Sequence, residues 1–231
     1  MVDKKWIYVL ILFIIVGLRL GYMDVNEDNY YWDEMVYLHL SESIEQGSYY
    51  SSIGEEFRAP LFPFLLSFFN QLHFIMFILV IVGMLLVYYL GKEIYNEEVG
   101  LISAIILGSM ELYFFYSLKI LVEPLTIIFL LGAMILLYKS KKNNYFIYWA
   151  SVLMGLAVLT KYLAGVFAIS VFLYLMYKKR WKELVISGVI FILMLTPLFV
   201  LGLINYGNPF GMLLINFFNE TINHGGFFYY F

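Results

Sequence analysis

The sequence predicts an all-α polytopic membrane protein, and three observations support this fold class. The chain has 231 residues, of which 63% are hydrophobic and only 13% are charged, whereas a soluble domain carries about 25% charged residues. Its mean hydropathy is +0.84. Long apolar runs recur along the whole chain, and such runs identify lipid as the surrounding solvent.

The apolar runs predict about seven transmembrane helices. They lie at residues 6–23, 74–90, 98–117, 120–138, 145–161, 162–177 and 183–204. The stretch 145–177 is divided into two short helices that meet near Lys161 and Tyr162, because the basic loops on either side of it must lie on one side of the membrane. No small-residue cleavage site follows the first run, so we interpret it as a retained signal anchor.

The basic residues predict the orientation. Ten of the 14 lysines and arginines fall in four short segments: Lys4, Lys5, Lys92, Lys139, Lys141, Lys142, Lys178, Lys179, Arg180 and Lys182. The positive-inside rule places these segments, and with them the N-terminus, in the cytoplasm. We therefore expect an integral protein of the cell membrane in which residues 24–60 and 205–231 are extracytoplasmic.

The first extracytoplasmic loop, residues 24–60, is strongly acidic. It holds nine aspartates and glutamates and a single basic residue, Arg58. Residues 34–46 have the pattern of an amphipathic helix with Gly47 as its stop signal. A second, interfacial helix is expected from Pro60 to Phe69, so juxtamembrane helices accompany the transmembrane ones.

Two neighbouring acids, Asp33 and Glu34, are the first candidates for chemistry. Adjacent helix positions point about 100° apart, so only one of them can face a given site. The alternative for Asp33 is that it caps the following helix, and for Glu34 that it only complements the helix dipole in the first turn.

Four cations, Arg19, Arg58, Lys119 and Lys161, lie outside the cytoplasmic segments, near the outer ends of predicted helices. A cation in a membrane helix pairs with an acid, serves a function, or extends its side chain to the membrane surface. We favour the last interpretation for Arg19. Lys161 has almost no loop around it, and a lipid phosphate would suit a cation at that depth. Lys119 and Glu123 are spaced as an i, i+4 ion pair at the start of a span.

These residues follow an order that resembles the N-terminal half of the GT-C glycosyltransferases, the superfamily of the aminoarabinose transferases and protein O-mannosyltransferases. The order begins with the Asp-Glu pair and with residues 58–63, which read Arg-Ala-Pro-Leu-Phe-Pro at a helix start. It continues with residues 116–123, which read Tyr-Ser-Leu-Lys-Ile-Leu-Val-Glu, residues 155–161, which read Gly-Leu-Ala-Val-Leu-Thr-Lys, and residues 205–210, which read Asn-Tyr-Gly-Asn-Pro-Phe. The resemblance covers nearly the whole chain, 1–231, as a single transmembrane domain.

The resemblance implies roles for particular positions. Asp33, with Glu34 beside it, matches the acidic residue of the first outer loop, which acts as the base toward the acceptor or binds the metal. Arg58 and Lys161 match residues that bind the carrier phosphate, and Lys119 is a third candidate for that role.

A divalent metal ion is a further cofactor candidate from the resemblance. Its candidate ligands are Glu123, Glu56 and His224. Glu56 departs from the family pattern, because relatives have Glu-Lys-Pro-Pro where this chain reads Phe57-Arg58-Ala59-Pro60, which displaces the acid by one position. Relatives also continue through further spans, so we expect the chain to be incomplete at its C-terminus.

The predicted function is therefore inverting transfer of a sugar from a polyprenyl-phosphate carrier to a glycan, lipid or protein acceptor on the extracytoplasmic side. Two alternatives remain open: a small transporter or flippase, or a non-catalytic remnant or subunit of such a transferase. Membrane lipid is the expected surrounding, and the net charge of −3 without a basic stripe predicts no nucleic-acid partner.

Overall fold

The computed structural model describes residues 4–22, 30–47 and 58–215, and these residues form helices with no strand among them. The helices are α1 Lys4–Tyr22, α2 Trp32–Glu45, α3 Leu61–Leu66, α4 Leu72–Ile94, α5 Glu97–Ser109, α6 Glu111–Leu118, α7 Glu123–Lys139, α8 Tyr145–Thr160, the 3-10 turn η2 Tyr162–Ala164, α9 Gly165–Tyr177, α10 Trp181–Met194 and α11 Thr196–Tyr206. The predicted all-α fold class is confirmed.

Several helices have the character of membrane spans. Among the described residues, two helices are long and apolar enough to cross a membrane, within α1 and α4, and the number rises to four if each of two bent pairs counts as one span. The bent pairs are α5 with α6, which meet at 66°, and α10 with α11, which meet at 45°. Each predicted apolar run coincides with a helix or a bent pair, but the number of seven spans stays a prediction.

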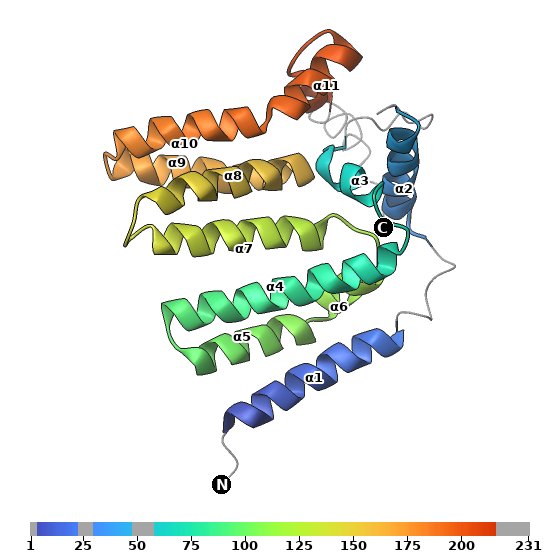
Figure 1. Ribbon diagram of the computed structural model, residues 1–231, viewed down its shortest axis with the longest axis vertical. Coiled ribbons are helices and arrows are strands. Elements are labelled where there is room, and N and C mark those ends of the chain that lie inside the picture. Colours follow the sequence, from blue (N-terminus) through green and yellow to red (C-terminus); the bar gives the residue numbers. More distant parts are fainter. Residues whose placement is uncertain (1–3, 23–29, 48–57, 216–231) are drawn as a thin grey trace, which may run out of the picture.

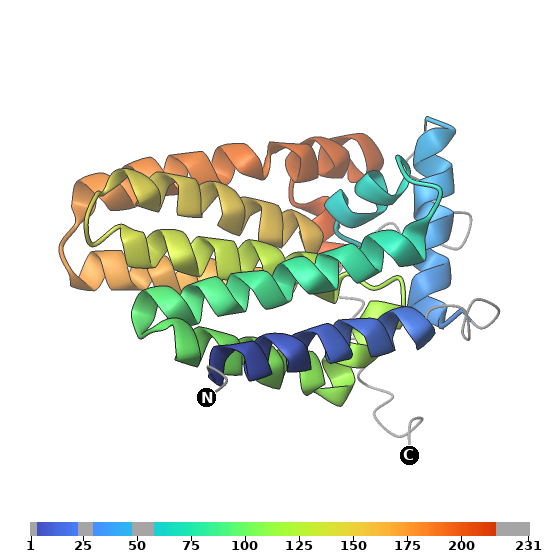
Figure 2. The same ribbon diagram turned by 60° about the horizontal axis from the view of Figure 1, so that its bottom comes forward.

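The long helices lie side by side and the chain runs back and forth between two ends of the bundle (Figures 1 and 2). The turns from α4 to α5, from α7 to α8 and from α9 to α10 lie at one end, together with the start of α1. These are the segments that carry the ten basic residues. Helices α2 and α3 lie at the opposite end, where α2 crosses the ends of the long helices. The two ends therefore differ in charge as the sequence predicts for the two membrane faces.

Arg19 ties α1 to the bend between α5 and α6. Its side chain is fully buried; Nη1 donates to the carbonyl of Tyr113 at 3.1 Å and Nη2 to the carbonyl of Gly108 at 2.6 Å. The Gly108 carbonyl is in the last turn of α5 and has no partner within that helix. The expectation that Arg19 extends to the membrane surface is therefore wrong.

The C-terminal half packs α7, α8, α9 and α10 around a core that includes Ala150, Met154 and Ala168. Helices α8 and α9 are separate, as predicted, because Lys161 between them has extended backbone angles. Pro197 explains the break between α10 and α11, since a proline ring cannot be accommodated inside a continuous helix.

Helices α2 and α3 pack on each other and on α4 and α7. The cluster between them contains Tyr37, Phe62, Met76 and Val122. Helix α2 covers most of the predicted range, and Gly47 follows it with φ +82°, a conformation that favours glycine. The predicted interfacial helix is present but shorter, as α3.

Candidate functional site

The first charged pair of the site joins α2 to the residue that precedes α3. Arg58 Nη2 lies 2.6 Å from Asp33 Oδ1. The guanidinium carbon lies 5.8 Å from the ring centroids of both Trp32 and Tyr37. The Asp33 side chain remains 48% exposed. The two rings thus hold Arg58 in position, while the Asp33 carboxylate remains accessible to solvent.

A second pair lies next to the first but is closed to solvent. Glu34 is fully buried and accepts hydrogen bonds from the backbone N–H groups of Ile120, at 2.7 Å, and Tyr31, at 2.8 Å. Lys119 Nζ lies 3.6 Å from its Oε2, and the lysine side chain is 5% exposed. Buried carboxylates are stable when they are both paired and hydrogen-bonded in this way. Glu34 therefore fixes the start of α2 on the segment between α6 and α7.

The third pair joins the start of α7 to the α8–α9 junction. Lys161 Nζ lies 2.7 Å from Glu123 Oε1, and the lysine side chain is 39% exposed. The second carboxylate oxygen, Glu123 Oε2, is buried and has no hydrogen-bond partner in the part of the chain that the structure describes. The Tyr162 hydroxyl is buried without one as well.

Tyr37 interacts electrostatically with both partly exposed pairs, Asp33–Arg58 and Glu123–Lys161. Burial raises the pKa of the Tyr37 hydroxyl above its ordinary value, Arg58 opposes this shift, and Glu123 and Asp33 add to it through their charges. Tyr162 in turn lies within electrostatic reach of Tyr37. Asp33, Arg58 and Glu123 therefore all act on the same tyrosine hydroxyl, and Lys161 joins this cluster as the partner of Glu123.

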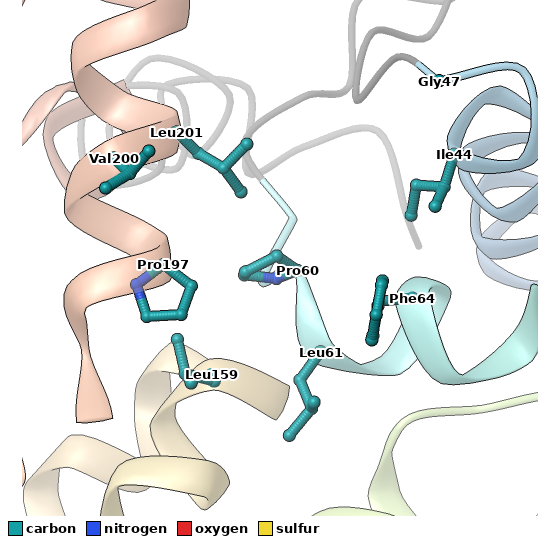
Figure 3. A pocket seen from close by; sticks show the side chains of 9 residues that line it. All are labelled: Ile44, Gly47, Pro60, Leu61, Phe64, Leu159, Pro197, Val200 and Leu201. Carbon is teal, nitrogen blue, oxygen red and sulfur yellow. The ribbon is translucent and has the colours of Figure 1, made fainter.

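An apolar cavity of about 620 Å³ lies at the same end of the bundle as this cluster. Its lining, drawn in Figure 3, comes from α2, α3, α8 and α11 and the residues next to them: Ile44, Gly47, Pro60, Leu61, Phe64, Leu159, Pro197, Val200 and Leu201. Pro60 is two residues from Arg58 and Leu159 is two residues from Lys161. Two of the site's cations therefore lie close in sequence to the wall of an apolar cavity.

Sequence reasoning chose most of these residues but not their partners. Lys119 pairs with Glu34 and Glu123 with Lys161, because residues 119–122 are not helical and the expected i, i+4 geometry does not exist. Asp33 is not the helix cap either, since the N-cap is Tyr31. Sequence reasoning did not select Tyr37, which lies on the buried face of the predicted amphipathic helix. A tyrosine on that face, within a strongly acidic loop, was the available signal.

The predicted metal site finds no support in the described residues. They contain no group of three histidines, aspartates or glutamates that could hold a metal ion, and Glu123 is bonded to a lysine. Glu56 and His224 lie outside the described residues. The metal ion therefore stays a prediction.

Comparison with curated proteins and with solved structures gives no match. One protein family does match: residues 58–204 fit the pattern of the dolichyl-phosphate-mannose-protein mannosyltransferases. This region contains Arg58, Lys119, Glu123 and Lys161, and it excludes Asp33 and Glu34. Because the match covers more than half of the chain, this membrane protein belongs to the dolichyl-phosphate-mannose-protein mannosyltransferase family.

Proposed function

We propose that the chain is a GT-C-type glycosyltransferase that moves a sugar, with inversion, from a polyprenyl-phosphate carrier to an acceptor on the extracytoplasmic side. The observation that carries this proposal is the cluster of Asp33, Arg58, Glu123 and Lys161 at the same end of the bundle as an apolar cavity. A polyprenyl-phosphate sugar complements this arrangement, because its anionic phosphate can bind the cations and its apolar chain can enter the apolar cavity. The cavity would hold the first part of the polyprenyl chain.

Arg58 and Lys161 would bind the carrier phosphate. Their side chains are 24% and 39% exposed, and an arginine has five N–H donors, so Arg58 can bind phosphate while it keeps Asp33. Fixed cations stabilise the negative charge that develops on the phosphate as it leaves. Lys119, buried against Glu34, would act on the site only by holding α2 in place.

Asp33 would act as the base. As the acceptor oxygen bonds to the anomeric carbon, the bond from that carbon to the phosphate oxygen breaks, and the phosphate leaves with the electron pair. The proton of the acceptor hydroxyl passes to the exposed Asp33 carboxylate. Attack from the face opposite the phosphate, without a covalent intermediate, inverts the anomeric carbon. Glu123 Oε2, which is buried without a partner among the described residues, would accept a hydrogen bond from a hydroxyl of the bound sugar or acceptor.

Replacement of Asp33 by Asn tests the base. In membranes that contain the chain, transfer from radiolabelled dolichyl-phosphate mannose to lipid or protein acceptors should slow by about 10²–10⁴-fold. The matched control is Glu42→Gln, which removes an exposed carboxylate from the same helix and should leave the rate unchanged. Equal rates for Asp33→Asn and wild type would show that Asp33 is not the base.

Carrier binding tests the cations separately from the chemistry. A radiolabelled polyprenyl phosphate should bind the purified Asp33→Asn protein as it binds wild type, whereas Arg58→Ala and Lys161→Ala should each weaken binding about tenfold or more, the loss of one charge-assisted contact. Lys182→Ala, at the opposite end of the bundle, is the control. If all four variants bind the carrier as wild type does, the two cations do not hold it.

A further inference from the structure

A second cavity, of about 340 Å³, lies at the opposite end of the bundle, between the end of α4 and the turn from α7 to α8. It is lined by Glu93, Tyr138, Lys139, Lys141, Lys142 and Phe146. Three lysines against one glutamate give the lining an excess of positive charge, and two aromatic rings complete it. The proposed transfer site does not use this arrangement.

The cavity is built from residues held in position. Lys139 Nζ lies 2.6 Å from the hydroxyl of Tyr89 on α4, where the lysine is the donor. Lys141 Nζ lies 4.3 Å from the centroid of the Tyr138 ring. The turn itself is anchored on its other side, because Asn144 donates to Glu183 and accepts from Arg180, both at 2.7 Å.

Most of the positive charge of this cavity is not balanced by its own lining, because Glu93 is the one carboxylate among the described lining residues and it acts on Lys139 through its charge. In the described part of the chain, Lys139, Lys141 and Lys142 form no ion pair with a carboxylate, although Arg58, Lys119 and Lys161 each do. Clustered lysines repel one another unless an anion lies between them. An anion from outside the chain would remove that repulsion.

We propose that this cavity binds the phosphate group of an anionic phospholipid from the adjacent membrane leaflet. The cavity lies at the end of a bundle of apolar helices, which is the depth of lipid headgroups, and basic pockets between membrane helices bind such headgroups. The rings of Tyr138 and Phe146 provide the amphipathic and apolar contacts that are typical of this interface. A soluble phosphate has the same anionic group but would make no use of the aromatic part of the lining.

Native mass spectrometry of the purified chain in neutral detergent tests the proposal. Phosphatidylglycerol and phosphatidylcholine are titrated separately, and the chain should bind one phosphatidylglycerol in preference to phosphatidylcholine. The Lys141→Gln/Lys142→Gln variant should bind phosphatidylglycerol about 30-fold more weakly, since each lysine near a lipid surface contributes about a fivefold increase in affinity.

The control variant is Lys178→Gln/Lys182→Gln, which removes two positive charges from the end of α9 and the first turn of α10, at the same end of the bundle but outside the cavity. It should bind phosphatidylglycerol as wild type does. An equal loss in both variants would show non-specific attraction to the basic end and would overturn the proposal. Displacement of the lipid by an equal concentration of inorganic phosphate would also overturn it, in favour of a soluble anion. None of these measurements depends on sugar transfer.

Discussion

At the scale of single residues, the charged side chains fall into two groups, one buried and one partly exposed to solvent. Glu34, Lys119 and Arg19 are buried and bind backbone groups or each other, so they hold helices together. Asp33, Arg58 and Lys161 are partly exposed and can contact a ligand. The sequence shows that all of these charges are unusual in an apolar chain, but it does not show which are buried.

The neighbours Asp33 and Glu34 illustrate what helical geometry can and cannot predict. The 100° rotation per residue correctly predicts that they face different partners. It does not predict which one faces the interior, because that depends on the position of residues 119–120, more than eighty positions along the chain. The reading of Asp33 as a helix cap is wrong because the helix begins at Trp32, so Asp33 lies within the first turn.

Replacement of Arg19 by Leu should lower the stability of the fold. It leaves the carbonyls of Gly108 and Tyr113 without their donors, and two hydrogen bonds from a charged group contribute about 2 kcal/mol or more together. Thermal unfolding of the purified chain in detergent should show a clearly lower Tm. Lys5→Gln, which removes an exposed ion pair from the same helix, should change the Tm little. Equal Tm values for Arg19→Leu and Lys5→Gln would contradict the role of Arg19.

At the scale of elements, hydropathy predicts where helices lie, but breaks within them need other signals. The runs 98–117 and 183–204 each form two helices that meet at an angle. Pro197 marks the second break in the sequence. The first, at Met110, follows Gly108 and Ser109, a residue pair at which helices often kink, and it is stabilised by Arg19 and by the Tyr113 hydroxyl, which donates to the carbonyl of Val80 at 2.9 Å. Contacts of this kind between distant residues leave no local pattern.

The hairpin of α4 and α5 depends on two glycines that let the backbones touch. A Cβ atom on Gly91 would lie 2.9 Å from the Cα of Gly100, and a Cβ on Gly100 would overlap the carbonyl of Tyr88. Gly100→Ala should therefore destabilise the fold by about 1–3 kcal/mol, the usual cost of overpacking, although alanine is the better helix former. Gly188→Ala is the matched control, because nothing lies within 4 Å of that Cβ, and it should be neutral or stabilising in the same detergent unfolding assay. A stable Gly100→Ala variant would mean that the two helices are not in backbone contact.

At the scale of the whole molecule, the sequence predicts a separation of charge that the arrangement of helices reproduces. Ten basic residues that are spread over four segments of the chain come together at one end of the bundle, while the acidic α2 and the partly exposed ion pairs lie at the other. The pairing within the site could not be predicted in the same way, because it depends on how α2 is placed across the helix ends. Which of the two ends faces the cytoplasm stays a prediction.

Single cysteines can test that orientation, because the natural chain contains no cysteine. Gln46 follows α2 and Asn143 lies in the turn from α7 to α8, and both are exposed. If the positive-inside rule holds, an impermeant thiol reagent added to intact cells should label Gln46→Cys, and it should label Asn143→Cys only after the membrane is permeabilised. Labelling of Asn143→Cys alone in intact cells would reverse the orientation and would put the candidate transfer site in the cytoplasm. Labelling of both from outside would mean that the two ends of the bundle lie on the same side of the membrane, and the back-and-forth arrangement of spans would then be wrong.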